Sequence, residues 1–344
     1  MCKKALITGI TGQDGAYLAK FLVEKDYQVY GAVRRSASLN LARLAALDIA
    51  ENVTFINYDA NELSNIMRVL EQTQPDEIYN LAAQSFVQAS FEQPLYTAQI
   101  SGVGTMRLLE AMRTLKMQAR FYQASTSEMF GHVRETPQTE MTPFYPRSPY
   151  GVAKLFAHWS VVNYREAFNM HASSGILFNH ESPLRGMEFV TRKITSQLAK
   201  LACGDEGVLE LGNLDAQRDW GYAPDYVKAM WLMMQQDQPD DFVIATGQTH
   251  SVRAFLEQAA KVMGFELVWE GEGLNERGLD RQSGRLLVKI NPDFFRPAEV
   301  DILIGDASKA IKKLGWQPEM SFEALVTCMA EADLKRAQEG ARWF

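Results

Sequence analysis

Near its amino end the chain reads ALITGITGQDG over residues 5–15. Ala5 to Thr8 has the apolar character of a buried strand, and glycines at G-x-x-G-x-x-G spacing follow it as Gly9, Gly12 and Gly15. In such a turn the first glycine permits a tight bend, the second lets the backbone approach a pyrophosphate, and the third permits close packing of helix on strand. The free N–H groups of the helix that begins here favour an anion. The stretch therefore predicts a dinucleotide-binding turn between a strand and a helix.

Strand and helix signals alternate along the chain beyond this turn. Parallel strands joined by right-handed helical crossovers make a doubly wound α/β sheet, so we predict a Rossmann-type domain. The predicted strands are 5–8, 28–33, 53–58, 77–81, 120–125 and 175–177, and the predicted helices are 16–24 and 106–115.

The pattern loosens after about residue 180, where glycine and proline interrupt short elements. We predict a helix at 225–234, a strand at 242–246 that returns to the first sheet, a terminal helix at 322–330, and a surface excursion or lid over 271–289. Methionines 230, 233 and 234 are predicted to fill the core. We therefore expect a dinucleotide-binding domain of residues 1–179 with a returning segment of about 222–250, and a smaller mixed α/β substrate domain of about 180–221 and 251–344.

The amino-acid composition limits the classes of partner that the protein is expected to bind. The 344 residues include 35 Lys+Arg and 42 Asp+Glu, a net charge of −7, and 47% are hydrophobic. An acidic, ordinary globular composition argues against broad nucleic-acid or anionic-membrane binding but allows one local basic pocket. No apolar run reaches the roughly 7–15 residues of a signal peptide or the roughly 20 of a membrane span. The odd, scattered cysteines 2, 203 and 328 predict no disulfide framework and no metal site, and favour a cytoplasmic protein.

The end of the second predicted strand indicates which dinucleotide binds. An Asp or Glu there normally contacts the ribose of NAD, but the chain reads Val33-Arg34-Arg35-Ser36 and has no acid. A guanidinium at this place can pair with a 2′-phosphate, which predicts NADP rather than NAD. A solvated arginine pair on a loop is the alternative.

A second pattern suggests proton chemistry. Tyr150 and Lys154 are spaced i, i+4, so on a helix both side chains face the same ligand. A nearby ammonium is expected to lower the phenol's pKa and make Tyr150 a usable base. Thr126 follows the predicted strand 120–125 at the carboxyl edge of the sheet, where its hydroxyl could hold a substrate oxygen. Alone, the Tyr–Lys spacing is also common by chance.

With these motifs the chain resembles the extended short-chain dehydrogenase/reductases that act on nucleotide sugars. Longer strings make it similar, nearly end to end, to the GDP-mannose 4,6-dehydratase family. They are GITGQDG (9–15), RRS (34–36), FYQASTSE (121–128), FYPRSPY (144–150), FNHESP (178–183), FVTRK (189–193), RDWG (218–221) and FRPAEV (295–300).

The resemblance implies an internal redox cycle in which Glu128 distinguishes a dehydratase from an epimerase. Hydride leaves C4 of the hexose for NADP⁺, the C5 proton becomes acidic beside the new ketone, the 6-hydroxyl departs, and hydride returns to C6. Glu128 would remove the C5 proton and assist the leaving hydroxyl. The related dTDP-glucose dehydratases share this work between adjacent Asp and Glu, whereas here Ser127 precedes the acid. The alternative to a catalytic role is that Glu128 is a helix N-cap residue or a solvent-exposed acid.

The resemblance also implies a fuller site and a homotetramer built from dimers. The catalytic residues would be Thr126, Glu128, Tyr150 and Lys154. The cofactor-binding residues would be Gly9, Thr11, Gly12, Gln13, Asp14, Gly15, Arg34, Arg35, Ser36, Asp59, Ala60, Leu81, Ala83, Ser85, Tyr96, Lys154, His180 and Arg185. The substrate-binding residues would be Ser85, Thr126, Glu128, Tyr150, Asn179, Lys193, Arg218, Arg296 and Glu299.

Three alternatives stay open. A relative acting on a longer GDP-sugar, such as a GDP-manno-heptose, shares the same motifs. A 4-reductase or epimerase would have no use for Glu128. A non-catalytic dinucleotide sensor of the same fold would have no use for Thr126, Tyr150 and Lys154 together.

Overall fold

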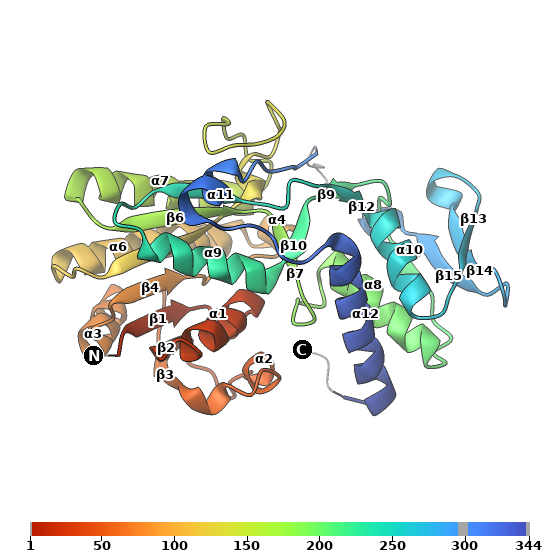
Figure 1. Ribbon diagram of the computed structural model, residues 1–344, viewed down its shortest axis with the longest axis horizontal. Helices are drawn as coiled ribbons and strands as arrows, with labels where there is room; N and C mark the ends of the chain where they lie inside the picture. Colours follow the sequence, from red (N-terminus) through yellow and green to blue (C-terminus); the bar gives the residue numbers. More distant parts are fainter. Residues whose placement is uncertain (1, 295–301, 342–344) are drawn as a thin grey trace.

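A seven-stranded parallel sheet forms the larger part of the molecule in the computed structural model, which describes residues 2–294 and 302–341 (Figure 1). Its strand order is β11-β6-β5-β4-β1-β2-β3. The strands are β1 (Lys4–Thr8), β2 (Gln28–Val33), β3 (Val53–Asn57), β4 (Glu77–Asn80), β5 (Arg120–Thr126), β6 (Ala172–Leu177) and β11 (Asp241–Ile244). The predicted doubly wound sheet is confirmed, and so is the returning strand, because β11 pairs in parallel with β6.

Helices cover both faces of this sheet because successive strand residues point to opposite sides. Leu6, Ile78 and Phe121 stand side by side and pack against one helical layer. That layer is α3 (Leu63–Thr73), α6 (Gly104–Thr114) and α7 (Pro149–Phe168). Tyr79 and Tyr122 point the other way, into the core beneath α1 (Gln13–Val23) and α9 (Ala223–Gln235).

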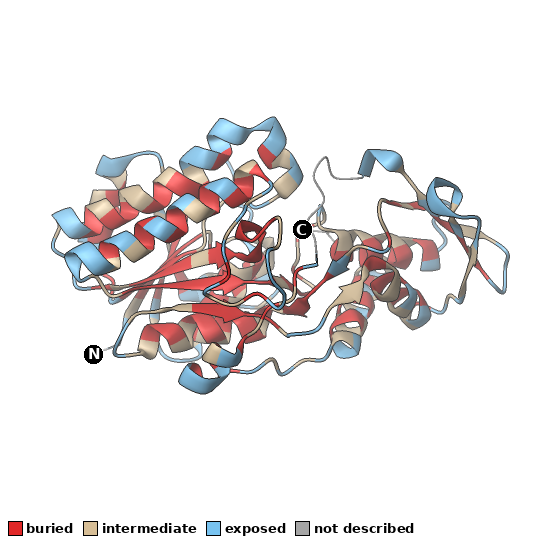
Figure 2. Cartoon of the chain, turned by 90° about the horizontal axis from the view of Figure 1, so that it is seen from above, coloured by how far each residue is buried: buried red, intermediate tan, exposed pale blue. Residues whose placement is uncertain are grey.

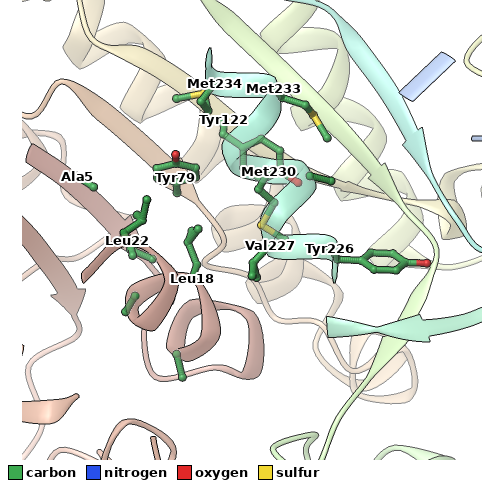
Figure 3. Close-up of a cluster of buried hydrophobic side chains, with 14 of the residues drawn as sticks. Ala5, Leu18, Leu22, Tyr79, Tyr122, Tyr226, Val227, Met230, Met233 and Met234 are labelled. Atoms are coloured by element: carbon green, nitrogen blue, oxygen red, sulfur yellow. The ribbon is translucent and has the colours of Figure 1, made fainter. Parts of the chain in front are cut away.

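The methionines of α9 lie in that second core. Met230, Met233 and Met234 are completely buried, and Figure 3 shows them gathered with Tyr122 and Tyr79. An unbranched thioether fills the irregular space between an aromatic strand surface and a helix. The prediction that these methionines are core filler is confirmed.

A smaller sheet corrects the expectation of a lid over residues 271–289. Its order is β13-β14-β15-β8, from β13 (Leu267–Glu270), β14 (Arg277–Asp280), β15 (Leu286–Ile290) and β8 (Leu209–Leu211). Much of the segment is therefore an antiparallel hairpin. Glycine marks a close approach here, because a side chain on Gly278 would meet the Trp269 ring at 3.2 Å. Asp280 is structural, since its carboxylate accepts bonds from the backbone and side chain of Ser283 in the hairpin turn.

A separate apolar core lies beneath the smaller sheet and includes three helices (Figure 2). They are α8 (Val190–Ala202), α10 (Val252–Val262) and α12 (Phe322–Glu339). The predicted terminal helix is confirmed and runs nine residues beyond its expected end at 330. A fully buried ion pair between Arg192 and Asp333, 2.8 Å apart, joins α8 to α12.

Short elements connect these units. They are α2 (Ala42–Ala45), α4 (Val87–Glu92), α5 (Pro94–Ala98), α11 (Ser308–Leu314), β7 (Asn179–Glu181), β9 (Gln217–Arg218), β10 (Trp220–Tyr222) and β12 (His250–Ser251). Strand β7 pairs with β10, β9 pairs with β12, and α11 packs against β11. In the described part of the chain, no helix has the length and apolarity needed to cross a membrane.

Candidate active site

A cavity of about 670 Å³ opens at the carboxyl ends of the large sheet. Its walls come from the segments that follow β1, β2, β3, β4, β5 and β6. The strand order reverses between β1 and β4, and a crevice outside such a switch point is where open α/β sheets bind ligands. The cavity is therefore the candidate active site.

The glycine turn forms the floor of this cavity. Gly9 has a φ of +73°, and a side chain there would meet the backbone of Ala82 at 2.8 Å. A side chain on Gly15 would meet the Gly9 carbonyl oxygen at 2.4 Å. Both positions thus require glycine, and the turn can present the start of α1 to an anion.

The structure brings most of the predicted cofactor residues to the cavity wall. Seventeen of the eighteen line it, and Arg35 is the exception: Gly9, Thr11, Gly12, Gln13, Asp14, Gly15, Arg34, Ser36, Asp59, Ala60, Leu81, Ala83, Ser85, Tyr96, Lys154, His180 and Arg185. Arg34 points along the wall, where one guanidinium nitrogen donates to the Tyr96 hydroxyl at 3.1 Å. Arg35 is exposed to solvent.

The predicted catalytic residues meet at the ends of β5 and α7. Ser148 caps α7 by accepting a hydrogen bond from the Gly151 N–H, and Pro149 begins the helix. This start aims Tyr150 and Lys154 into the cavity, where the Lys154 ammonium donates to the Ala124 carbonyl at 2.8 Å. Thr126, the last residue of β5, lines the same cavity as Tyr150.

The proton affinities here differ from the expectation. Burial raises the pKa of Tyr150 well above its ordinary value; Thr126 opposes this shift and the charge of Glu128 adds to it. The prediction of a lowered Tyr150 pKa is wrong, because burial dominates. The Lys154 ammonium lies 5.9 Å from the centre of the ring and is bound to a carbonyl. Burial lowers the pKa of Lys154 itself to about 8, although the charge of Asp14 opposes the change.

Glu128 lies directly after β5, in the short 3₁₀ turn Ser127–Met129. Its backbone N–H donates to the Thr126 side-chain oxygen at 3.2 Å, so Thr126 is the residue that caps this turn. The Glu128 side chain lines the cavity with only 8% of the residue exposed. The structure therefore excludes both non-catalytic alternatives for Glu128, a helix N-cap residue and a solvent-exposed acid.

His180 and Asp14 form a close pair in the same cavity. The His180 Nε2 lies 2.8 Å from a carboxylate oxygen of Asp14, and its Nδ1 lies 2.7 Å from the Phe178 carbonyl oxygen. Burial opposes the charge on His180, but Asp14 outweighs it and raises the pKa of the ring. For Asp14, burial is likewise outweighed by His180, and its pKa falls to about 2.

The predicted substrate residues separate into two groups. Ser85, Thr126, Glu128, Tyr150 and Asn179 line the cavity. Lys193 and Arg218 do not line it. The Lys193 ammonium lies 3.5 Å from the centre of the Phe294 ring, and Arg218 forms a backbone bridge with Leu303. Arg296 and Glu299 lie outside the described residues.

The sequence interpretation missed Arg43, from the short helix α2. Its guanidinium donates to the Leu184 carbonyl at 2.7 Å and to the Thr11 carbonyl at 3.2 Å, and it lines the cavity. It therefore links the glycine turn to the loop that follows β7. A single arginine outside any motif gives no sequence signal for such a contact.

Within residues 2–294 and 302–341, no group of three or more His, Cys, Asp or Glu side chains could hold a metal ion.

Comparison with known proteins gives a consistent result. The family model described as GDP-mannose 4,6 dehydratase matches residues 6–329. The chain is 56% identical over 339 residues to a GDP-mannose 4,6-dehydratase of Sinorhizobium fredii, covering 96% of this chain and 97% of that protein. It is 52% identical over 339 residues to the GDP-mannose 4,6 dehydratase of Homo sapiens, covering 96% and 91%.

Among solved structures, the fold is similar to that of a dTDP-glucose 4,6-dehydratase from Streptomyces venezuelae with NAD and TYD bound. The TM-score is 0.82 at 20% identity, covering 97% of this chain and 98% of that one. At this identity the likeness concerns the fold.

Proposed function

The chain belongs to the GDP-mannose 4,6-dehydratase family, and from this premise we propose that it converts GDP-D-mannose to GDP-4-dehydro-6-deoxy-D-mannose with bound NADP. One observation carries the proposal: a buried carboxylate, Glu128, lines the same cavity as Thr126, Tyr150 and Lys154. A 4-epimerase eliminates nothing and does not need this acid. A non-catalytic sensor does not need the tyrosine and lysine.

Each of the four side chains has a distinct part in the proposed reaction. When bound, NADP supplies the acceptor and later the donor of the hydride. Thr126 holds the C4 oxygen, and Tyr150 takes its proton as the ketone forms. Lys154 remains cationic below a pH of about 8, and its charge would favour the tyrosinate against the opposing effect of burial. Glu128 removes the C5 proton and gives a proton to the departing 6-hydroxyl, so water leaves with no net proton change at the carboxylate. When hydride returns to C6, C5 takes up one proton, which balances the proton that Tyr150 removed from the C4 hydroxyl.

We assign the choice of NADP over NAD to Arg34. It lies at the end of β2, lines the cavity, and is oriented by Tyr96, and no acid stands in Val33 to Ser36. Arg35, outside the cavity lining, would reach with Ser36 across a subunit interface, as the family resemblance implies. Arg34 would bind the 2′-phosphate of the NADP held by its own subunit.

Arg34→Glu is therefore expected to weaken NADP binding by about 10–100-fold, because it removes a charge-assisted contact worth roughly 1.5–3 kcal/mol. NAD has no 2′-phosphate, so its binding should change far less. Titration of each cofactor by calorimetry measures the ratio. Arg68→Glu, on the exposed face of α3, is the matched charge control. Equal losses for both cofactors would contradict the assignment.

The guanosine diphosphate half of the substrate is proposed to lie toward Lys193 and Arg218, together with Arg296 and Glu299. The two described cations lie beside Phe294 and Leu303, which flank that stretch in the sequence. A thermal-shift screen of GDP-mannose, dTDP-glucose and UDP-glucose, each with NADP⁺, tests the base preference. Stabilisation by GDP-mannose alone is expected, and preference for another base would contradict the substrate assignment. A GDP-manno-heptose stays the second candidate.

We further propose that the protein is a homo-oligomer with dimers as its building block, the tetramer being the assembly that the family resemblance implies. Val152, Phe156 and Trp159 recur at helical spacing on α7 and are 55%, 43% and 55% exposed. An apolar stripe of this kind on a helix is well suited to burial against a second copy of itself.

The variant Phe156→Glu/Trp159→Glu is expected to shift the particle to monomers, because it places two charges in the buried centre of that interface. Light scattering measures the mass. Ile311→Glu, at an exposed isoleucine on α11, is the control and should leave the mass unchanged. Wild-type protein that is monomeric at every concentration would contradict the dimer.

We propose a cytoplasmic location for this activity. The cysteines at positions 2, 203 and 328 are all free thiols, which suits a reducing compartment.

A further inference from the structure

The hydrogen bonds of His180 determine its protonation state. One ring nitrogen faces the Phe178 carbonyl oxygen at 2.7 Å and the other faces an Asp14 carboxylate oxygen at 2.8 Å. A carbonyl oxygen and an ionised carboxylate only accept hydrogen bonds. Both ring nitrogens must therefore carry a proton, and the ring that satisfies this geometry is an imidazolium.

Other contacts hold this pair in place from several elements. The His180 ring stacks on Tyr226 of α9, with centroids 4.5 Å apart and planes 21° from parallel. Gln13, beside Asp14, donates to the His180 carbonyl oxygen at 3.0 Å and accepts from Ser182 at 2.7 Å. The start of α1 is thus fastened to β7 and the loop after it. Arg185, from that loop, is the cation that opposes the charge on His180.

Asp14 also acts on the catalytic helix. Its carboxylate lines the same cavity as Lys154 and Tyr150. It is the group whose charge supports the Lys154 ammonium against burial. One carboxylate at the first turn of α1 therefore faces two cations of the cavity, His180 directly and Lys154 at longer range.

We propose that Asp14 is a positioning residue for the reaction: it holds His180 as a fixed imidazolium that locks α1 to β7, and its carboxylate faces the cavity that Lys154 also lines. This role is separate from contact with the cofactor. Both ring protons of His180 are committed to hydrogen bonds within the protein. The catalytic part of the inference rests on the proposed function, whereas the state of His180 does not.

The variant Asp14→Asn removes the negative charge at position 14 and keeps a side chain of the same shape beside His180. Its amide can donate to Nε2 of a neutral ring that still donates from Nδ1 to the Phe178 carbonyl, so the ring orientation is retained. With the negative charge gone, burial and Arg185 both favour the neutral ring, while Tyr226 contributes no charge. The same variant also removes the negative charge that favours the protonated form of Lys154.

The first test uses the protein without ligands. In ¹⁵N-histidine NMR, His180, assigned with His180→Gln, is expected to show both ring nitrogens protonated at pH 7.5 in the wild type. In Asp14→Asn it should show one protonated and one bare nitrogen. A neutral His180 in the wild type, or an imidazolium that persists in the variant, would overturn the proposal. This readout does not depend on dehydratase activity.

The second test is the pH profile of kcat with GDP-mannose and NADP⁺. Loss of activity on the alkaline side, where Lys154 deprotonates, is expected to begin about 1 pH unit lower in Asp14→Asn. An unchanged profile alongside the NMR change would overturn the link to Lys154. Absence of turnover in the wild type, with the expected NMR result, would instead count against the proposed function alone.

Glu77→Gln is the matched control. Glu77 is buried and ion-paired with Lys3 at 3.0 Å, but it lies at the opposite, amino end of the sheet strands. Losing its charge should lower thermal stability without moving either the His180 signals or the pH profile. If Glu77→Gln produced the same pH shift as Asp14→Asn, general destabilisation would explain the result and the positioning role would fail.

Discussion

Tyr150→Phe is expected to lower turnover of GDP-mannose by about 10²–10⁴-fold, the usual contribution of a general base. The substitution removes the phenol hydroxyl and keeps the ring, which is almost entirely buried. Cofactor affinity should therefore stay close to that of the wild type. Turnover is followed by the formation of the 4-keto product, and cofactor binding by calorimetry.

Tyr164→Phe provides the comparison on the same helix. The Tyr164 hydroxyl bonds with Glu110 at 2.8 Å on the far part of α7, outside the cavity lining, so its loss should leave turnover nearly unchanged. Near-normal turnover in Tyr150→Phe would remove Tyr150 from the mechanism. Equal losses in both variants would indicate damage to the helix rather than to the chemistry.

Glu128→Gln is expected to divide the reaction into its halves. Hydride transfer from C4 requires Thr126, Tyr150 and Lys154, which the variant retains. Removal of the C5 proton requires a carboxylate, which it lacks. Reduced cofactor should therefore accumulate on the protein, visible as absorbance of the reduced nicotinamide, while 6-deoxy product is not formed. Deuterium from heavy water should not enter C5.

Glu135→Gln is the control for this experiment, because that carboxylate accepts a bond from Thr142 and lies outside the cavity lining. It should turn over at the wild-type rate without bound reduced cofactor. Product formation at the wild-type rate by Glu128→Gln would show that Glu128 is not the C5 base. An epimerase interpretation would then gain support.

The large sheet could be predicted because its signals are local. Each buried parallel strand is a short apolar run, and a glycine turn fixes the first crossover. The small sheet could not be predicted in the same way. Its hairpin contains Gly278 beneath Trp269 and a buried Asp280 that organises the turn, and both residues look like loop signals in the sequence. Pairing partners far along the chain decide their role.

In the candidate site, too, residues placed by local sequence signals could be predicted, and residues placed by contacts with distant parts of the chain could not. Motif residues such as Thr126 and Tyr150 are placed by a strand end and a helix start, and they reach one cavity. Arg43 contacts a carbonyl 141 residues away, which no local pattern encodes. The Tyr150 pKa was mispredicted because burial outweighs a lysine whose ammonium is bound to Ala124. Burial is a property of the assembled site rather than of a four-residue spacing.

Transfer of the C4 hydrogen of the substrate tests the central claim most directly. GDP-mannose deuterated at C4 is incubated with the protein and NADP⁺, and the product is analysed by NMR and mass spectrometry. An internal redox cycle at one cavity predicts that the deuterium appears at C6 of GDP-4-dehydro-6-deoxy-D-mannose. Deuterium that returns to C4, or that is released into free reduced cofactor while C6 carries none, would contradict the account.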